Sequence, residues 1–245
     1  MSIACKWNWH NTGHQVWYDK STYETLKTSY PLYFYDDFVG SAGGSVFNAT
    51  QIWQVVDVGA ATEAIVADSS NGLFRLHMHV TGEDEDAILY QNDNRTFDVG
   101  NSLIFETKID MATLPTLGTR GVVGMCGDTN ADKDLITESA WFKWSGSGAI
   151  LVETDDTSND NANVATGVTS VAGTPNIFRI DFTTLANVKF FIDGVRVATG
   201  TTFDMSNLSA AEQQMQPYFS FDKANPNAGL GDMDIDYVKI WSNRA

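Results

Sequence analysis

Short runs in which apolar and polar residues alternate are separated by clusters of glycine, asparagine, aspartate and serine along most of this chain. The clearest runs are residues 73–80, 103–111, 178–182 and 233–241. Alternation with a period of two residues is typical of a strand that buries one face. The pattern therefore predicts an all-β protein built as an antiparallel two-sheet sandwich.

Two local signals refine this prediction. The pair Asp193-Gly194 separates the runs 188–192 and 195–197, and an Asp-Gly pair between two strands predicts a tight hairpin because both turn positions favour positive φ. Residues 209–215 have helical character, and Ser206 or Asn207 precedes them as an N-cap, so we expect one short helix there.

Residues 1–30 differ from the remainder because they are rich in aromatic side chains and show no sustained period. Such a segment is typical of an arm that another surface must cover, and we expect residues 31–245 to form one β domain. A terminal strand that packs on its own domain is the alternative. The aromatic residues that we expect to mediate contacts of the arm are Trp7, Trp9, Trp17 and Tyr18.

The charge balance narrows the class of partner. The chain has 15 Lys and Arg against 31 Asp and Glu, which gives a formal net charge of −16. An acidic surface repels phosphate backbones and anionic lipid, so we expect no nucleic-acid binding. We also expect no membrane insertion and no Sec-type export signal, because neither a long apolar run nor a charged leader followed by one occurs. Cys5 and Cys126, the two cysteines, are expected to be reduced thiols.

Four motifs in order resemble the concanavalin A-like lectin/glucanase superfamily. They are YDDFVG at residues 35–40, NGLFRL at 71–76, FFIDGV at 190–195 and DIDYVKIW at 234–241. The resemblance implies that residues 31–245 form a jelly roll, a fold that hosts catalysts, lectins and scaffolds alike.

The glucanases of this superfamily carry a Glu-x-Asp-x-Glu motif, and the nearest match here is incomplete. Glu153 and Asp155 would lie on one face of a strand, but the place of the second glutamate holds Thr157 or Ser158. Neither hydroxyl is a useful proton donor near neutral pH, and retaining hydrolysis needs two carboxyl groups. We therefore expect no enzymatic activity and interpret Glu153 as a solvated charge at a strand end.

Other ligand sites are weaker in sequence. Trp141 and Trp144 are candidates to stack on sugar rings, with core packing as the alternative. His77 and His79 share one face of a strand, which is too few ligands for a usual zinc site. Residues 128–134 begin like a calcium loop but depart from it at its sixth and twelfth positions, which indicates a solvated acidic loop. Resemblance to calcium-holding jelly rolls instead implies a structural calcium at Asp236.

The ending DYVKIW is also similar to that of small lectin-like proteins encoded among tailed-phage structural genes. This resemblance implies a non-enzymatic virion protein that decorates or cements a capsid and is made in the host cytoplasm. Its expected partner is the major capsid protein or a second copy of the chain, with a trimer inferred by analogy and surface glycans as further ligands. The alternative is a carbohydrate-binding or glucan-hydrolysing jelly-roll protein.

Overall fold

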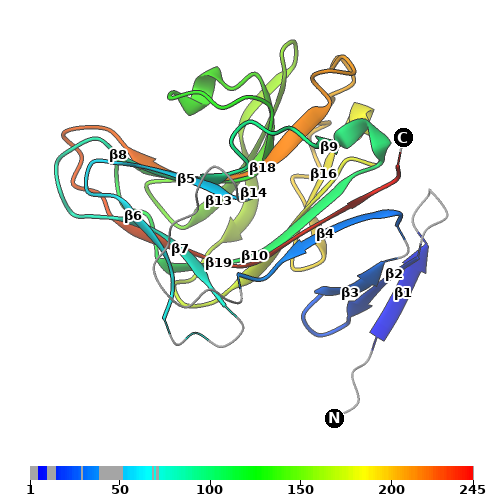
Figure 1. Ribbon diagram of the computed structural model, residues 1–245, viewed down its shortest axis with the longest axis horizontal. Helices are drawn as coiled ribbons and strands as arrows, with labels where there is room; N and C mark the ends of the chain where they lie inside the picture. The colour runs from blue at the N-terminus through cyan, green and yellow to red at the C-terminus, as the bar shows by residue number, and fades with distance from the viewer. Residues whose placement is uncertain are drawn as a thin grey trace.

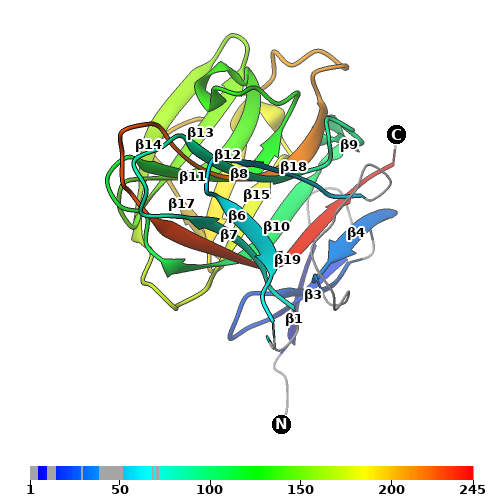
Figure 2. The same ribbon diagram turned by 60° about the vertical axis from the view of Figure 1, so that its left-hand side comes forward.

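The computed structural model describes residues 5–9, 15–28, 30–38, 52–67, 69 and 72–244, with the backbone alone described for 5–9, 15–16 and 26–28. Two antiparallel sheets face each other across the core, and a third, smaller sheet lies outside them beside β4 and β19 (Figure 1; Figure 2). The predicted two-sheet sandwich is thereby confirmed.

One layer, here called the β19 sheet, is organised around the long C-terminal strand. One edge of β19 pairs with β10, and its other edge pairs with β7 and then with β4. From edge to edge its strands are β17 (Val195–Val197), β16 (Lys189–Ile192), β15 (Asn176–Asp181), β10 (Ile104–Thr113), β19 (Gly231–Ser242), β7 (Phe74–Met78) and β6 (Thr62–Ile65), with β4 (Leu32–Asp36) beside β19.

The second layer, here called the β18 sheet, has the same plan. One edge of β18 pairs with β11, and the other pairs with β8 and the two-residue β9. Its strands in spatial order are β14 (Asp160–Thr169), β13 (Ala149–Asp156), β12 (Glu138–Ser145), β11 (Thr119–Cys126), β18 (Gln214–Lys223), β8 (Glu85–Tyr90) and β5 (Gln54–Val58), with β9 (Phe97–Asp98) beside β18.

The remaining elements are short. Residues 5–28 contain the N-terminal sheet, whose strands are β1 (Cys5–Trp9), β2 (Gln15–Asp19) and β3 (Thr25–Thr28). Three 3₁₀ turns occur in the described residues: η1 (Val99–Asn101), η2 (Lys133–Leu135) and η3 (Leu185–Asn187). None of the described helices is long and apolar enough to cross a membrane.

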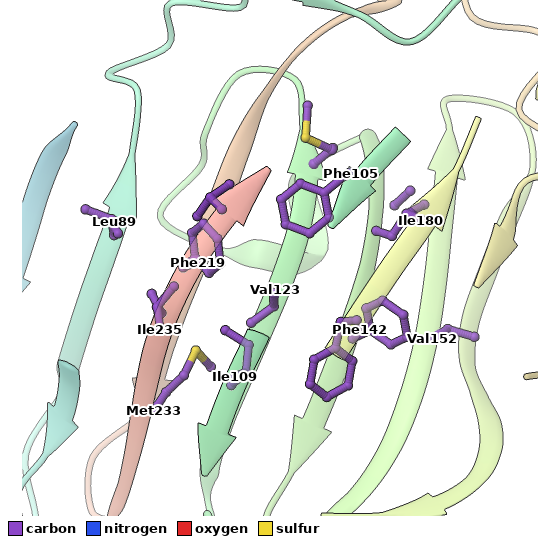
Figure 3. Close-up of a cluster of buried hydrophobic side chains, with 14 of the residues drawn as sticks. Leu89, Phe105, Ile109, Val123, Phe142, Val152, Ile180, Phe219, Met233 and Ile235 are labelled. Atoms are coloured by element: carbon purple, nitrogen blue, oxygen red, sulfur yellow. The ribbon is translucent and has the colours of Figure 1, made fainter. Parts of the chain in front are cut away.

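The core follows from the two-residue period of the strands. Inward side chains of the two sheets meet in one layer, where Phe142 packs edge-on against Phe178 and Phe190 at centroid distances of 4.8 and 5.3 Å. Figure 3 shows this layer, whose labelled members are Leu89, Phe105, Ile109, Val123, Phe142, Val152, Ile180, Phe219, Met233 and Ile235. The predicted hairpin is also confirmed, since Asp193 and Gly194 have φ of 49° and 73°.

The predicted helix over residues 209–215 is wrong. Ser209 and Glu212 exchange capping hydrogen bonds, and the N–H of Gln213 donates to the Ser209 carbonyl, so one helical turn does form. At Gln214 the chain enters β18, where Met215 is fully buried. Burial of that strand's alternate side chains and its pairing with β11 outweigh the local helical preference.

Candidate functional site

The two tryptophans expected to stack on sugars are both buried in β12. Trp144 points into the core against Phe178 and donates its indole N–H to Ser170 Oγ at 3.0 Å. Trp141 lies on the opposite, outer face of the β18 sheet, in a small apolar cluster with Ile136 and Tyr218. Trp144 is 0% exposed and Trp141 is 1% exposed, so neither ring is free to stack on a sugar. The core-packing alternative therefore describes Trp144, whereas Trp141 is covered by a loop.

Asp236, the expected calcium ligand, lies on β19 and pairs with the ammonium group of Lys108 on the neighbouring β10. This amine already balances the carboxylate charge that a cation would balance. Among the described residues, no three His, Cys, Asp or Glu side chains gather where they could hold a metal ion. Asp236 is thus already paired with an amine, and a structural calcium at this residue stays a prediction.

The aromatic N-terminal segment is paired as a sheet and fixed to the sandwich through β3. Thr25 donates from its N–H and its Oγ1 to the buried carboxylate of Glu106, at 3.0 and 2.7 Å. Lys239 donates to Glu24 Oε1 at 2.9 Å and to the Thr25 carbonyl at 2.8 Å. These contacts correspond to the alternative in which the N-terminal segment packs on its own domain.

Of the residues expected to mediate contacts of the arm, Trp17 is 38% exposed, and Tyr18 is half-buried with its ring stacked near Tyr23 at 6.4 Å. Trp7 and Trp9 lie on β1, and their side chains fall outside the described ones. A role for the segment in assembly stays a prediction.

The histidine pair lies on the outer face of the β19 sheet. The His77 and His79 rings meet edge to face at a centroid distance of 4.3 Å, and His77 Nδ1 pairs with Asp232. Beside them is an open hollow of about 420 Å³, whose lining includes Arg75, His77 and Asp232. Arg75 is already held by a bidentate ion pair with Asp234, so Arg75, His77 and Asp232 beside this hollow are all paired. His79 Nδ1, in contrast, is buried and has no hydrogen-bond partner among the described residues.

The strongest candidate site lies on the outer face of the β18 sheet, where Glu153 is not the solvated strand-end charge expected from sequence. Glu153 is 7% exposed, and its Oε2 accepts a hydrogen bond from Lys143 Nζ at 2.9 Å. The two residues lie on adjacent strands, since Trp141 on β12 is the register partner of Glu153 on β13. An ion pair this deeply buried holds both side chains in one geometry.

A cavity of about 190 Å³ opens above this ion pair. Its floor is formed by β12 and β13, one wall by β14, and the opposite wall by the loop that carries η2. The lining residues are Lys133, Asp134, Ile136, Lys143, Glu153, Asp155, Asp160, Ala162 and Asn163. With about 30 Å³ for each water in the liquid, the cavity holds about six waters, which is near the size of one sugar ring.

Charges around the cavity are paired in a chain. Arg120 donates two hydrogen bonds to Asp222, at 3.1 and 3.0 Å, and a third to Asp134 at 2.9 Å. Asp134 in turn lies 3.8 Å from Lys143 Nζ. On the other side, burial raises the pKa of Asp155, and its carboxylate accepts the N–H of Thr157 at 2.8 Å. The site thus presents fixed carboxylate, ammonium and amide groups around a small hollow.

This arrangement can bind a hydroxylated ligand. Carboxylates accept hydrogen bonds from hydroxyl groups, and side-chain amides both accept and donate them, at angles set by their planar geometry. Hydrolysis with retention would need a nucleophile and a second carboxyl group as proton donor at about 5 Å. In this sequence Thr157 or Ser158 stands where the glucanase motif has its second glutamate.

Sequence reasoning located Glu153 and Asp155 but missed Lys143, Asp160 and Asn163. Lys143 could have been found from the sequence, because it lies two residues after Trp141 and therefore on the same outward face of the strand. Asp160 and Asn163 could not, since β14 pairs irregularly with β13 and its register cannot be obtained from a period. The acidic loop at residues 128–134 is exposed at most of its positions, as expected, but Lys133 within it is 1% exposed and donates to Asp86 at 2.6 Å.

No protein-family model matches the sequence, and a search of curated proteins finds no relative. Solved structures do match the fold. A protein of unknown function from Shewanella oneidensis MR-1 is 14% identical, with 87% of this chain and 88% of that one covered and a TM-score of 0.58. A candidate beta-glucanase from Mycobacterium abscessus is 17% identical, with coverages of 85% and 99% and a TM-score of 0.56.

The carbohydrate recognition domain of Emp47p is 10% identical, with 79% of this chain and 89% of that domain covered and a TM-score of 0.52. Identities this low show a shared fold and no more. The chain thus has the jelly-roll sandwich that lectin-like and glucanase-like proteins also use, and its function must be argued from its own residues.

Proposed function

We propose that this protein is a non-hydrolytic glycan-binding protein whose site is the cavity over β12, β13 and β14. The observation that carries the proposal is the buried Lys143–Glu153 ion pair at the cavity floor, which fixes polar groups in one geometry. Pre-fixed polar groups lower the entropic cost of binding.

The surrounding charges indicate which glycans to expect. Asp134, Asp155 and Asp160 line the cavity together with the ion pair, and the whole chain carries a net charge of −16. Sialylated, sulfated and uronic-acid glycans would be repelled by this surface. Neutral sugars, whose hydroxyl groups can donate to the carboxylates, are the ligand class that fits.

A glycan array probed with the wild-type protein and with Asn163→Ala tests the proposal. Asn163 lines the cavity wall and forms no part of the ion-pair chain, so its loss should weaken binding without loss of fold. Asn176→Ala is the matched control, because its amide contacts Asp193 at the far hairpin. We expect neutral glycans to bind wild type and the control alike, and Asn163→Ala more weakly. Equal binding by all three, or binding of acidic glycans only, would contradict the proposal.

We further propose, as a second role, that the protein is carried on a virion and joined to its particle through the N-terminal sheet. Support comes from the position of that sheet outside the sandwich, where β1 pairs with β2 and, within the described residues, with no other strand. A free strand edge can accept a strand from a partner. Deletion of residues 1–14 removes β1 and spares the Thr25 anchor. Unchanged association with purified particles, or with other copies of the chain, would argue against this role.

A further inference from the structure

The loop of residues 127–137 makes an excursion that its neighbouring strands do not require. β11 and β12 pair as far as Cys126 and Ser139, and the Gly127 N–H then donates to the Glu138 carbonyl at 2.8 Å. A two-residue turn could join strands at that separation. The chain instead runs out over the outer face of the β18 sheet, where η2 is visible above the strands (Figure 1).

Beneath this loop the floor of the cavity continues as an apolar surface. Trp141 and Tyr218 lie side by side there, with ring centroids 6.3 Å apart, next to Val122 and Ile88. The loop covers them with a single buried apolar side chain, that of Ile136. Its neighbour Leu135 is 61% exposed and adds nothing to the cover.

Polar groups under the loop lack partners. Trp141 Nε1 and Ser139 Oγ are buried and form no hydrogen bond, although both residues are only 1% exposed. A buried donor without an acceptor is costly, and most native structures avoid it. Both residues lie on the outward face of β12, as does Lys143 at the cavity floor. A hydroxylated ligand lying along this face would supply the missing partners.

The loop is held over the floor largely by exchangeable polar contacts. Lys133 donates to Asp86 at 2.6 Å, and Asp134 accepts from Arg120 at 2.9 Å. Burial raises the pKa of Asp86, which means that the loss of water around the carboxylate offsets part of its attraction to Lys133. At the outer end, Thr129 donates to Asp93 from its N–H at 2.9 Å. Water could replace each of these contacts if the loop lifted away.

We infer that the glycan site continues beneath residues 128–136, so that its full ligand is an oligosaccharide and the loop is displaced when a long chain binds. This inference rests on the proposed function. The covered face spans β12, β11, β18 and β8, three strand spacings or about 14 Å, which exceeds one sugar ring. Apolar faces of successive sugar rings would pack on Trp141 and Tyr218. Loop closure then lowers the apparent affinity for long glycans by the fraction of molecules that are open.

The test compares short and long glycans on variants that open the loop. The probes are the disaccharides and hexasaccharides of β-1,3-glucan, β-1,4-mannan and β-1,4-galactan, titrated by calorimetry. Ile136→Ser removes the apolar contact of the loop, and Leu135→Ser is its matched control. A second variant replaces residues 128–137 with Asn-Gly. It also carries Asp86→Asn, because deletion of Lys133 would leave the Asp86 carboxylate without its partner. This second variant provides the test if Ile136→Ser fails to fold.

We expect both opening variants to raise the ratio of hexasaccharide affinity to disaccharide affinity about tenfold over that of wild type. The ratio is compared because Ile136 and the deleted Lys133 and Asp134 also line the cavity, so their loss affects both ligands. Leu135→Ser should match wild type for both lengths. Disaccharide binding by wild type together with an unchanged affinity ratio in a folded opening variant would overturn this inference and leave the proposed function standing. Absence of binding to every glycan by every variant would overturn both.

Discussion

Replacing Lys143 with methionine tests whether the ion pair at the cavity floor is as buried as the structure indicates. Lys143 and Glu153 are 6% and 7% exposed, and their charged atoms lie 2.9 Å apart. Methionine nearly fills the volume of the lysine stem but leaves the Glu153 carboxylate without its ammonium partner. Breaking a buried pair in this way costs about 3–5 kcal/mol, because an uncompensated charge remains on a largely buried carboxylate.

The assay is urea denaturation of Lys143→Met, Glu153→Gln and the double variant. The double variant should recover most of the loss, since two neutral side chains that replace a buried pair often cost little. Lys108→Met is the control, because its pair with Asp236 is partly exposed, at 32% and 23%, and should be worth about 0–1 kcal/mol. A loss below about 1 kcal/mol for Lys143→Met, equal to that of the control, would refute the reasoning.

Three further predictions concern the edges of the fold. Burial, together with a nearby negative charge, raises the pKa of Glu63 to about 7, so its protonated form stabilises the fold below the ordinary pKa and this contribution is lost as pH rises through 7. After allowance for screening, Glu63→Gln should raise the free energy of unfolding by about 1 kcal/mol at about pH 8 and leave it unchanged at about pH 5. An equal change in melting temperature at both pH values would contradict this prediction. Thr25→Val removes one donor from the buried Glu106 carboxylate and should cost about 1–3 kcal/mol by urea titration, whereas a change of a few tenths would mean that the N-terminal sheet is not anchored there. Gly194→Ala should lower stability by about 1–3 kcal/mol, because φ is +73° and a Cβ would lie 2.3 Å from the Tyr23 ring. Adding Tyr23→Ala to this variant should restore part of the loss. A melting temperature of Gly194→Ala equal to that of wild type would contradict this packing.

Much of the fold could be predicted because it depends on local patterns. The alternating run that contains Phe74, Leu76 and Met78 forms a strand with those three side chains buried, as a period of two requires. The turn at Asp193-Gly194 was predictable because its backbone conformation favours those residue types. The 209–215 segment failed because long-range strand pairing outweighed a local helical signal.

The candidate site could be predicted only in part, since it depends on contacts between distant segments. Glu153 was singled out from its motif, but its burial follows from the register of β12 against β13, which places Lys143 beside it. Trp141 alternates correctly for an outward residue, and no sequence pattern shows that residues 127–137 fold back to cover it. Irregular loops leave no periodic trace, so the loop's cover of the cavity had to come from the structure.

Locating the ligand by NMR tests the central claim most directly. Titration of the isotope-labelled protein with a neutral disaccharide that binds in the array should shift the backbone amide signals of residues 134, 143, 153–155 and 160–163, which surround the cavity. Signals around the exposed, stacked rings of Tyr33 and Tyr35 on the opposite sheet should stay in place. Shifts confined to that tyrosine face, with the cavity signals unmoved, would show that the buried ion pair does not mark a glycan site.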